Sequence, residues 1–253
     1  MLDFNQNINV LSNKRTTGVA AGKAVEDCIV QLQKTKESIR IVFAAAPSQD
    51  SMLDYLTKSK LIDWSKIEAF HMDEYIGLKP GSPQLFSSYL ENNLFSKVPL
   101  NKNTINVNND VSSEIKRYTN LLEEAPIDIV CLGIGENGHL AFNDPHVADF
   151  NDSEIVKVVE LDDACRLQQV NDGCFESFQK VPEKAITLTI PTLLKGTHLF
   201  CVVLGANKSD AVKNALTEPI STSCPASILT THPDCNYYFD KEAYKGIECL
   251  QNA

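Results

Sequence analysis

A glycine-rich turn near the middle of the chain is followed by polar side chains that could do chemistry. The stretch 132–145 reads Leu-Gly-Ile-Gly-Glu-Asn-Gly-His-Leu-Ala-Phe-Asn-Asp-Pro and follows an apolar run typical of a buried strand. Gly135 and Gly138 allow a sharp turn and let a ligand approach the backbone closely. His139 is the best placed for chemistry, because an imidazole titrates near neutrality and can move protons when a carboxylate such as Asp144 orients it.

Two adjacent carboxylates, Asp73 and Glu74, come directly after a second apolar strand at 66–72. A carboxylate at the carboxyl end of a strand is well placed for general acid–base work. Successive side chains diverge, so we expect only one of the two to face a site, and carboxylates at this position also serve as turn residues or helix caps. His71, inside the strand, is interpreted as a structural histidine.

The pattern Gly-x-Gly-x-x-Gly at 133–138 also matches a dinucleotide-binding fingerprint. That fingerprint should open a helix and be followed about 20 residues later by an acid for the ribose. Here His139 and Asn143 follow instead, and Pro145 prevents an extended helix. We therefore expect no nicotinamide cofactor.

Composition excludes several other classes of protein. The 253-residue chain carries 33 acidic and 23 basic residues, a formal charge of −10, which disfavours a nucleic-acid or anionic-membrane surface but leaves room for a local phosphate pocket. Its eight cysteines are scattered without a Cys-x-x-Cys pair, no secretory signal is recognisable, and no apolar run approaches the ~18 residues of a membrane span. These features favour a cytoplasmic protein with free thiols and no metal site.

The hydrophobic pattern alternates between strand and helix along most of the chain. Strands are predicted at 39–44, 66–72, 127–132, 156–161, 185–190, 198–204 and 236–239, and helices at 17–34, 48–59, within 81–94, at 112–124, 191–194 and 209–216. This order predicts one α/β domain over residues 1–253, a doubly wound, mostly parallel sheet with helices on both faces (Rossmann-like). The polar segment 162–184 is too long for a bare connection and is interpreted as a mobile lid.

Two of these stretches together resemble a known family. Met72-Asp-Glu-Tyr-Ile-Gly-Leu78 and the turn at 133–145 are similar to motifs of the glucosamine-6-phosphate deaminase (isomerase) family, whose fold is shared with 6-phosphogluconolactonases. The segments 203–208 and 220–227 also fall in family order, so the resemblance covers nearly the whole chain. Phe142-Asn-Asp-Pro145 favours the deaminase branch.

The resemblance implies an activity and roles for four residues. The expected reaction converts a 2-amino-2-deoxyhexose 6-phosphate to a ketose 6-phosphate and ammonia, without cofactor or metal. Asp73 matches the base that moves a proton between C2 and C1, and His139 matches the group that opens the sugar ring. Asp144 stands where the family usually has a glutamate, and Asn137 stands where many members have an aspartate. Asn137 can hydrogen-bond but cannot take up a proton or lend charge to the imidazole.

The phosphate-binding residues depart further from the family pattern. The first predicted strand leads into Ala45-Ala46-Pro-Ser48-Gln in place of a Thr-Gly-Ser-Thr-Pro loop, yet amides at a helix start and the Ser48 hydroxyl can still hold an anion. Arg166 matches a phosphate-binding arginine of the lid, whereas Asn171 stands where a second arginine is expected. The remaining candidates are Lys208, a cation that opposes the dipole of the helix it precedes, and the glycines at 135 and 138.

Two alternatives stay open. A sugar-phosphate lactonase on the same fold would need the histidine but not Asp73 as an enolising base. A non-catalytic sugar-phosphate sensor would bind without turnover, and the asparagine at position 137 favours it, although no helix-turn-helix or basic region is visible. In every case the expected partner is a small sugar phosphate. The configuration of the sugar at C4 and the oligomeric state, including a homo-oligomer, are left open.

Overall fold

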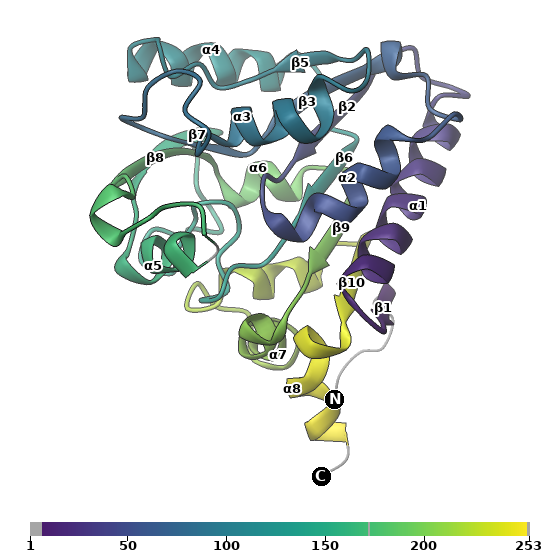
Figure 1. The fold of residues 1–253 in the computed structure, drawn as a ribbon, viewed down its shortest axis with the longest axis vertical. Helices are drawn as coiled ribbons and strands as arrows, with labels where there is room; N and C mark the ends of the chain where they lie inside the picture. Colours follow the sequence, from purple (N-terminus) through teal and green to yellow (C-terminus); the bar gives the residue numbers. More distant parts are fainter. Residues whose placement is uncertain (1–6, 172, 252–253) are drawn as a thin grey trace.

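The chain forms one seven-stranded parallel sheet with a small three-stranded sheet beside it (Figure 1). The computed structural model describes residues 7–171 and 173–251. The strands of the central sheet, in spatial order, are β1 (Asn7–Leu11), β10 (Cys235–Asp240), β9 (His198–Val203), β6 (Ile129–Leu132), β2 (Ile39–Phe43), β3 (Ile67–His71) and β5 (Asn101–Asn103). The small sheet has the order β4 (Asp73–Tyr75), β8 (Lys184–Leu188) and β7 (Val156–Glu160), with antiparallel pairing.

Helices connect these strands. The α-helices are α1 (Lys14–Leu32), α2 (Asp50–Thr57), α3 (Phe86–Leu90), α4 (Val111–Glu123), α5 (Asp163–Asn171), α6 (Ile190–Leu194), α7 (Ser209–Thr217) and α8 (Lys241–Gln251). Short 3₁₀ helices are η1 (Pro47–Gln49), η2 (Trp64–Lys66), η4 (Phe178–Lys180), η5 (Ala206–Lys208) and η6 (Pro225–Thr231), and η3 (Glu91–Phe95) is a π-helical continuation of α3. No helix of the described residues has the length and apolar character needed to span a bilayer.

The strand order reverses between β2 and β6, which lie side by side in the centre of the sheet. From β2 the chain moves outward through β3 to β5, then returns to β6 and proceeds the other way. Loops that leave two such strands diverge to opposite faces and open a crevice at the strands' carboxyl ends, where doubly wound sheets bind ligands. The predicted doubly wound, mostly parallel fold is therefore confirmed, and its switch point lies between two of the stretches singled out in the sequence.

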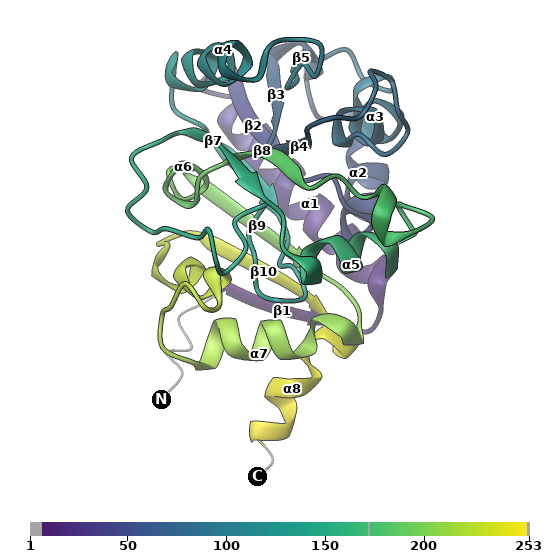
Figure 2. The ribbon, with the colours of Figure 1, turned by 90° about the vertical axis from the view of Figure 1, so that its left-hand side faces the viewer.

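Both faces of the central sheet are covered, as the figures show from two sides (Figures 1 and 2). Along β2, Ile39, Ile41 and Phe43 pack with α1 and α2, whereas Val42 packs on the other face with the core that includes α4, α6, α7 and α8. This alternation follows from the two-residue period of a strand. It explains why the sequence of β2 is apolar throughout.

The second sheet was not predicted. Residues 156–161 and 185–190 were correctly predicted as strands, but they pair with each other and with β4 rather than extending the parallel sheet. β4 consists of three residues whose partner strand is distant in the sequence, so its local pattern carries no signal. Its consequence is direct, because antiparallel pairing of Asp73 with Thr187 fixes the backbone of the first candidate base.

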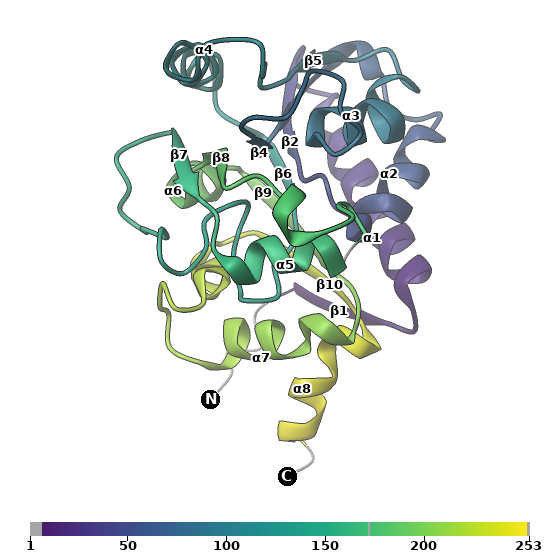
Figure 3. The ribbon, with the colours of Figure 1, turned by 60° about the vertical axis from the view of Figure 1, so that its left-hand side comes forward.

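The polar segment 162–184, interpreted from the sequence as a mobile lid, contains helical elements that were not predicted. It contains α5 and η4, and it packs over a third apolar cluster that includes Phe142, Cys165 and Phe175. In the ribbon views α5 lies below α3 and above α7 (Figure 3). Three further elements, β1, β5 and α8, were missed; β5 is the exposed Asn-Lys-Asn edge of the sheet and has no strand-like composition.

Candidate active site

A cavity of about 550 Å³ opens at the switch point of the sheet. Its walls come from the loops after β2, β3, β6 and β9. Residues of the segment 162–184 form a further wall. Of the predicted site residues, seven line it: Ala45, Ala46, Ser48, Asp73, Gly135, His139 and Lys208. The parallel sheet thus brings together side chains that are far apart in the sequence.

Asp73 is the carboxylate of this cavity. It is 7% exposed, and among the described residues that line the cavity it alone carries a carboxylate. Burial, with the nearby charge of Glu74 adding to it, raises the pKa of Asp73 well above its ordinary value. A carboxylate that gives up its solvation in this way binds a proton more strongly than an exposed one, which suits a general base.

Glu74 points the other way and has a structural role. Its carboxylate accepts hydrogen bonds from the backbone amides of Phe86 and Ser87, at 3.0 and 2.9 Å, and from the Ser87 hydroxyl at 2.7 Å. It therefore caps the first turn of α3. The expectation that only one of the two adjacent carboxylates faces a site is confirmed, since the other is occupied by a helix start.

The neighbouring His71 also has a structural role. Its side chain is fully buried, and its Nε2 accepts a hydrogen bond of 2.8 Å from the backbone amide of Ile105. Burial lowers the pKa of His71 to about 4, so it is neutral when it accepts this bond. The interpretation as a structural histidine is confirmed.

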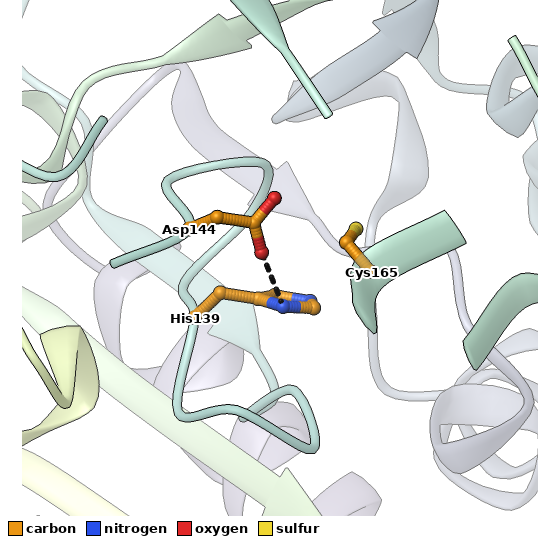
Figure 4. Close-up of side chains that lie close together, drawn as sticks. All are labelled: His139, Asp144 and Cys165. Atoms are coloured by element: carbon orange, nitrogen blue, oxygen red, sulfur yellow. Dashed lines mark ion pairs between the residues drawn. The ribbon is translucent and has the colours of Figure 1, made fainter. Parts of the chain in front are cut away.

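His139 contacts two residues of its own loop, Asp144, which Figure 4 shows, and Asn137. Its Nδ1 lies 3.0 Å from Oδ1 of Asp144 and 2.7 Å from Oδ1 of Asn137. Asn137 also accepts the backbone amide of His139 at 3.1 Å and donates from Nδ2 to Asp144 at 3.0 Å, which fixes its amide orientation. With two oxygen acceptors at Nδ1, the neutral ring carries its proton there and leaves Nε2 as the proton acceptor.

Asp144 is fully buried behind the imidazole. Burial opposes its ionisation, but the hydrogen bond and charge of His139, with the hydrogen bond from Asn137, outweigh it and hold the pKa of Asp144 below its usual value. Cys165 of α5 lies beside the pair; ligand atoms of His139, Asp144 and Cys165 fall within 4.8 Å of one another, and so do those of Asp144, His146 and Asp162. Each group offers three ligand atoms, and in the first the imidazole and carboxylate are already engaged with each other.

Gly135 makes room for the ring. A Cβ at this position would lie 2.2 to 2.4 Å from three atoms of the His139 imidazole, so the ring rests directly against the glycine backbone. Gly138, in contrast, does not line the cavity: its φ of +84° makes the turn before His139, and its α-carbon faces Cys224. Of the two predicted glycines, one therefore meets the cavity and the other shapes the loop.

Arg166 lies outside the cavity. Its guanidinium donates to the backbone carbonyl oxygens of Phe178 and Val181, at 3.3 and 3.0 Å, and lies 4.1 Å above the Phe178 ring. In this arrangement it joins the two ends of the segment 162–184 rather than contacting a phosphate. The residues of that segment that do line the cavity, Gln168, Gln169, Gly173 and Cys174, were not singled out in the sequence.

The walls of the cavity are linked through Glu136. Its backbone amide donates to Oε1 of Gln168 at 3.0 Å, and its carboxylate accepts from Nδ2 of Asn207 at 2.5 Å. The histidine loop, α5 and the loop that carries Lys208 are thereby joined at one residue. A further lining residue, Lys14 at the start of α1, was missed. The signal was available, because a lysine at a helix N-terminus opposes the helix dipole, as the argument for Lys208 already used.

The chain is similar in sequence to proteins of one family. Residues 12–237 match the family described as glucosamine-6-phosphate isomerases/6-phosphogluconolactonase. The chain belongs to this family. It is 37% identical over 191 residues to a glucosamine-6-phosphate deaminase of Clostridium botulinum (strain Kyoto / Type A2), covering 74% of this chain and 76% of the relative. It is 32% identical over 239 residues to that of Bacillus thuringiensis (strain Al Hakam), covering 94% and 87%.

Solved structures support the same family. A monomeric glucosamine-6-phosphate deaminase superposes with a TM-score of 0.86 at 27% identity, covering 95% of this chain and all of the other. The 6-phosphogluconolactonase of Thermotoga maritima gives a TM-score of 0.74 at 17% identity, covering 93% and 98%, which is a likeness of fold alone. The resemblance inferred from the two motifs is thus confirmed.

Proposed function

We propose that the protein is an amino-sugar-phosphate deaminase that converts a 2-amino-2-deoxyhexose 6-phosphate to a ketose 6-phosphate and ammonia. The main candidate substrate is glucosamine 6-phosphate. Family membership and relatives named glucosamine-6-phosphate deaminase at 32–37% identity support this activity. One observation carries the chemistry: a buried carboxylate, Asp73, and an oriented imidazole, His139, share a single cavity with Lys208.

Ring opening is assigned to His139. The unprotonated Nε2 takes the proton of the anomeric hydroxyl and returns it to the ring oxygen; the C1–O5 bond breaks and C1 becomes an aldehyde. Asp144 and Asn137, both at Nδ1, stabilise the ring while it transiently carries two protons. The carboxylate supplies charge and the amide supplies orientation.

Isomerisation and deamination are assigned to Asp73. The carboxylate removes the proton from C2, the electrons move to form a C1–C2 double bond, and O1 takes up a proton. Return of a proton to C1 leaves a C2 imine; water adds to C2, the C2–N bond breaks, and ammonia departs as the ketone forms. The raised pKa of Asp73 suits this role. The C2–H bond is only weakly acidic, and a carboxylate of higher pKa removes its proton with a smaller difference in pKa between acid and base.

Ammonia release from glucosamine 6-phosphate and from galactosamine 6-phosphate tests the activity and the sugar configuration together. Turnover of one or both, absent in Asp73→Asn, is the expected result. Hydrolysis of 6-phosphogluconolactone without ammonia release would indicate the lactonase alternative, and tight binding of both amino sugars without turnover would indicate a sensor. Because the 6-phosphogluconolactonases among the similar structures share 12–17% identity with this chain, they support the fold and leave this choice to the assay.

The remaining expectations concern the protein's surroundings. We propose that its substrate partner is a small sugar phosphate and that it works in the cytoplasm. A similar solved deaminase is described as monomeric, whereas the sequence left a homo-oligomer open. Light scattering of the purified protein decides between these states.

A further inference from the structure

We propose that Lys14 is a second phosphate-binding cation, so that the substrate's phosphate is held between Lys14 and Lys208. This inference rests on the proposed function, since it assigns the phosphate end of the same cavity. Lys14 belongs to α1 and Lys208 to η5, and both line the cavity. No sequence motif links them; the fold alone brings the start of the first helix to the loop after β9.

Gly205 lies beside the side chain of Lys14 and contacts the backbone of Lys208. The ammonium of Lys14 lies 3.6 Å from the point where a Cβ on Gly205 would stand, and the backbone amide of Lys208 donates to the carbonyl oxygen of Gly205 at 3.1 Å. Gly205 has a φ of +97°, which favours glycine, and its missing side chain keeps this corner open. The amide of Gly205 is fixed by both carboxylate oxygens of Asp240, at 3.0 and 3.1 Å.

The surroundings leave the charge of Lys14 available. Within residues 7–171 and 173–251, no carboxylate pairs with Lys14 and no hydrogen bond of its ammonium is found. The nearby acid, Asp240, is engaged with the backbone amides of Gly205 and Ala243. Lys14 also opens the 19-residue helix α1, whose first turn contains no acidic residue. A cation there opposes the helix dipole, and a bound dianion would relieve that repulsion.

The position of Arg166 makes a second cation necessary. A phosphate dianion buried in a cavity needs charged donors, and Arg166 spends its guanidinium on two carbonyl oxygens of the lid segment. Asn171, where the family pattern led us to expect another arginine, is uncharged. Of the described residues that line the cavity, Lys14 and Lys208 are the two lysines, none is an arginine, and the Ser48 hydroxyl adds an uncharged donor.

The test compares Lys14→Ala, Lys14→Arg and a control, Lys23→Ala, in the full-length protein. Lys23 lies on the same helix, is exposed, and does not line the cavity. Its ammonium pairs with the carboxylate of Asp27 at a distance of 2.8 Å. For glucosamine 6-phosphate we expect Lys14→Ala to raise KM at least tenfold with kcat within about threefold, because phosphate binding acts equally on ground and transition states. Lys14→Arg should recover most of the loss, and the control should match wild type.

A binding measurement keeps this inference separate from the proposed reaction. Calorimetry with glucose 6-phosphate and with glucose reports the phosphate contribution without turnover. Wild type should bind the phosphorylated sugar, and Lys14→Ala at least tenfold less tightly, even if no ammonia is ever released. Lys14→Ala should also melt at the same or a slightly higher temperature than wild type, since it removes an unfavourable charge from the start of α1. Unchanged affinity in Lys14→Ala, or no glucose 6-phosphate binding by wild type, would overturn the inference.

Discussion

Asn137 accepts two hydrogen bonds from His139, one from the backbone amide at 3.1 Å and one from Nδ1 at 2.7 Å. The residue therefore holds both the loop and the ring. An aspartate in the same place would keep both bonds and add a negative charge beside Asp144, whose Oδ1 lies 3.0 Å from Nδ2 of Asn137. The asparagine thus preserves the geometry of the histidine while limiting the charge around it.

The first prediction concerns this charge. We expect Asn137→Asp to keep the fold and to move the acid limb of the pH–rate profile upward, because a second carboxylate stabilises the imidazolium form of His139 relative to the neutral form that acts as a base. The measurement is kcat/KM across pH 5–9, with Asn137→Ser as a neutral control. An unchanged acid limb would show that the rate does not depend on the protonation of His139.

The second prediction concerns Gly135. We expect Gly135→Ala to lower kcat about 10- to 100-fold, because the new methyl group would lie 2.2 to 2.4 Å from the His139 ring and displace it from its position. Gly81→Ala is the control: its φ of +75° makes any side chain strained, but no atom lies within 4 Å of the added Cβ. The control should lose stability by about 1 kcal/mol while keeping its kcat. Equal kcat in the two variants would contradict the account.

The third prediction concerns the stability cost of Asp73. Its folded-state pKa is raised, so the native state holds this proton more tightly than the unfolded chain does. The stability contributed by that proton is present below the unfolded pKa, about 3.9, and is lost as pH rises through the folded pKa. Asp73→Asn should therefore gain stability over wild type as pH rises, although it is inactive. Denaturant unfolding of both proteins at pH 4 and pH 8 measures the difference; a variant less stable at pH 8 would count against it.

The fourth prediction separates two roles for Arg166. Its contacts with the carbonyl oxygens of Phe178 and Val181 imply that Arg166→Ala loosens the segment 162–184. We expect faster protease cleavage in this segment, and slower cleavage of wild type when glucose 6-phosphate is present. If the arginine instead contacts phosphate, as the sequence pattern suggested, cleavage without ligand will be unchanged and only affinity for phosphorylated sugars will fall.

The main elements and the chemical residues could be predicted because their signals are local. Asp73 and His139 each follow a buried strand, and parallel strands place their carboxyl ends at one edge of the sheet. Glu74 could be separated from Asp73 only by side-chain divergence, and the structure supplies the reason, a helix cap on α3.

The features that were missed depend on contacts between distant parts of the chain. β4 becomes a strand only by pairing with β8, and Arg166 donates to the carbonyl oxygens of Phe178 and Val181 within the segment 162–184. Lys14 reaches the cavity only because α1 starts beside the loop after β9. None of these contacts has a fixed spacing in the sequence: the charge of Lys14 at a helix start could be read locally, but its place beside the cavity could not.

Solvent exchange at C2 tests the central claim most directly. In D₂O with glucosamine 6-phosphate, wild type should release ammonia and yield a ketose phosphate that carries deuterium at C1. NMR measures the deuterium at C1. Asp73→Asn should lower this rate by about 10²–10⁴-fold while still binding glucose 6-phosphate with wild-type affinity. Ammonia release that survives in Asp73→Asn, or a wild type that neither exchanges the C2 proton nor releases ammonia, would contradict the assignment of Asp73 as the base of an amino-sugar-phosphate deaminase.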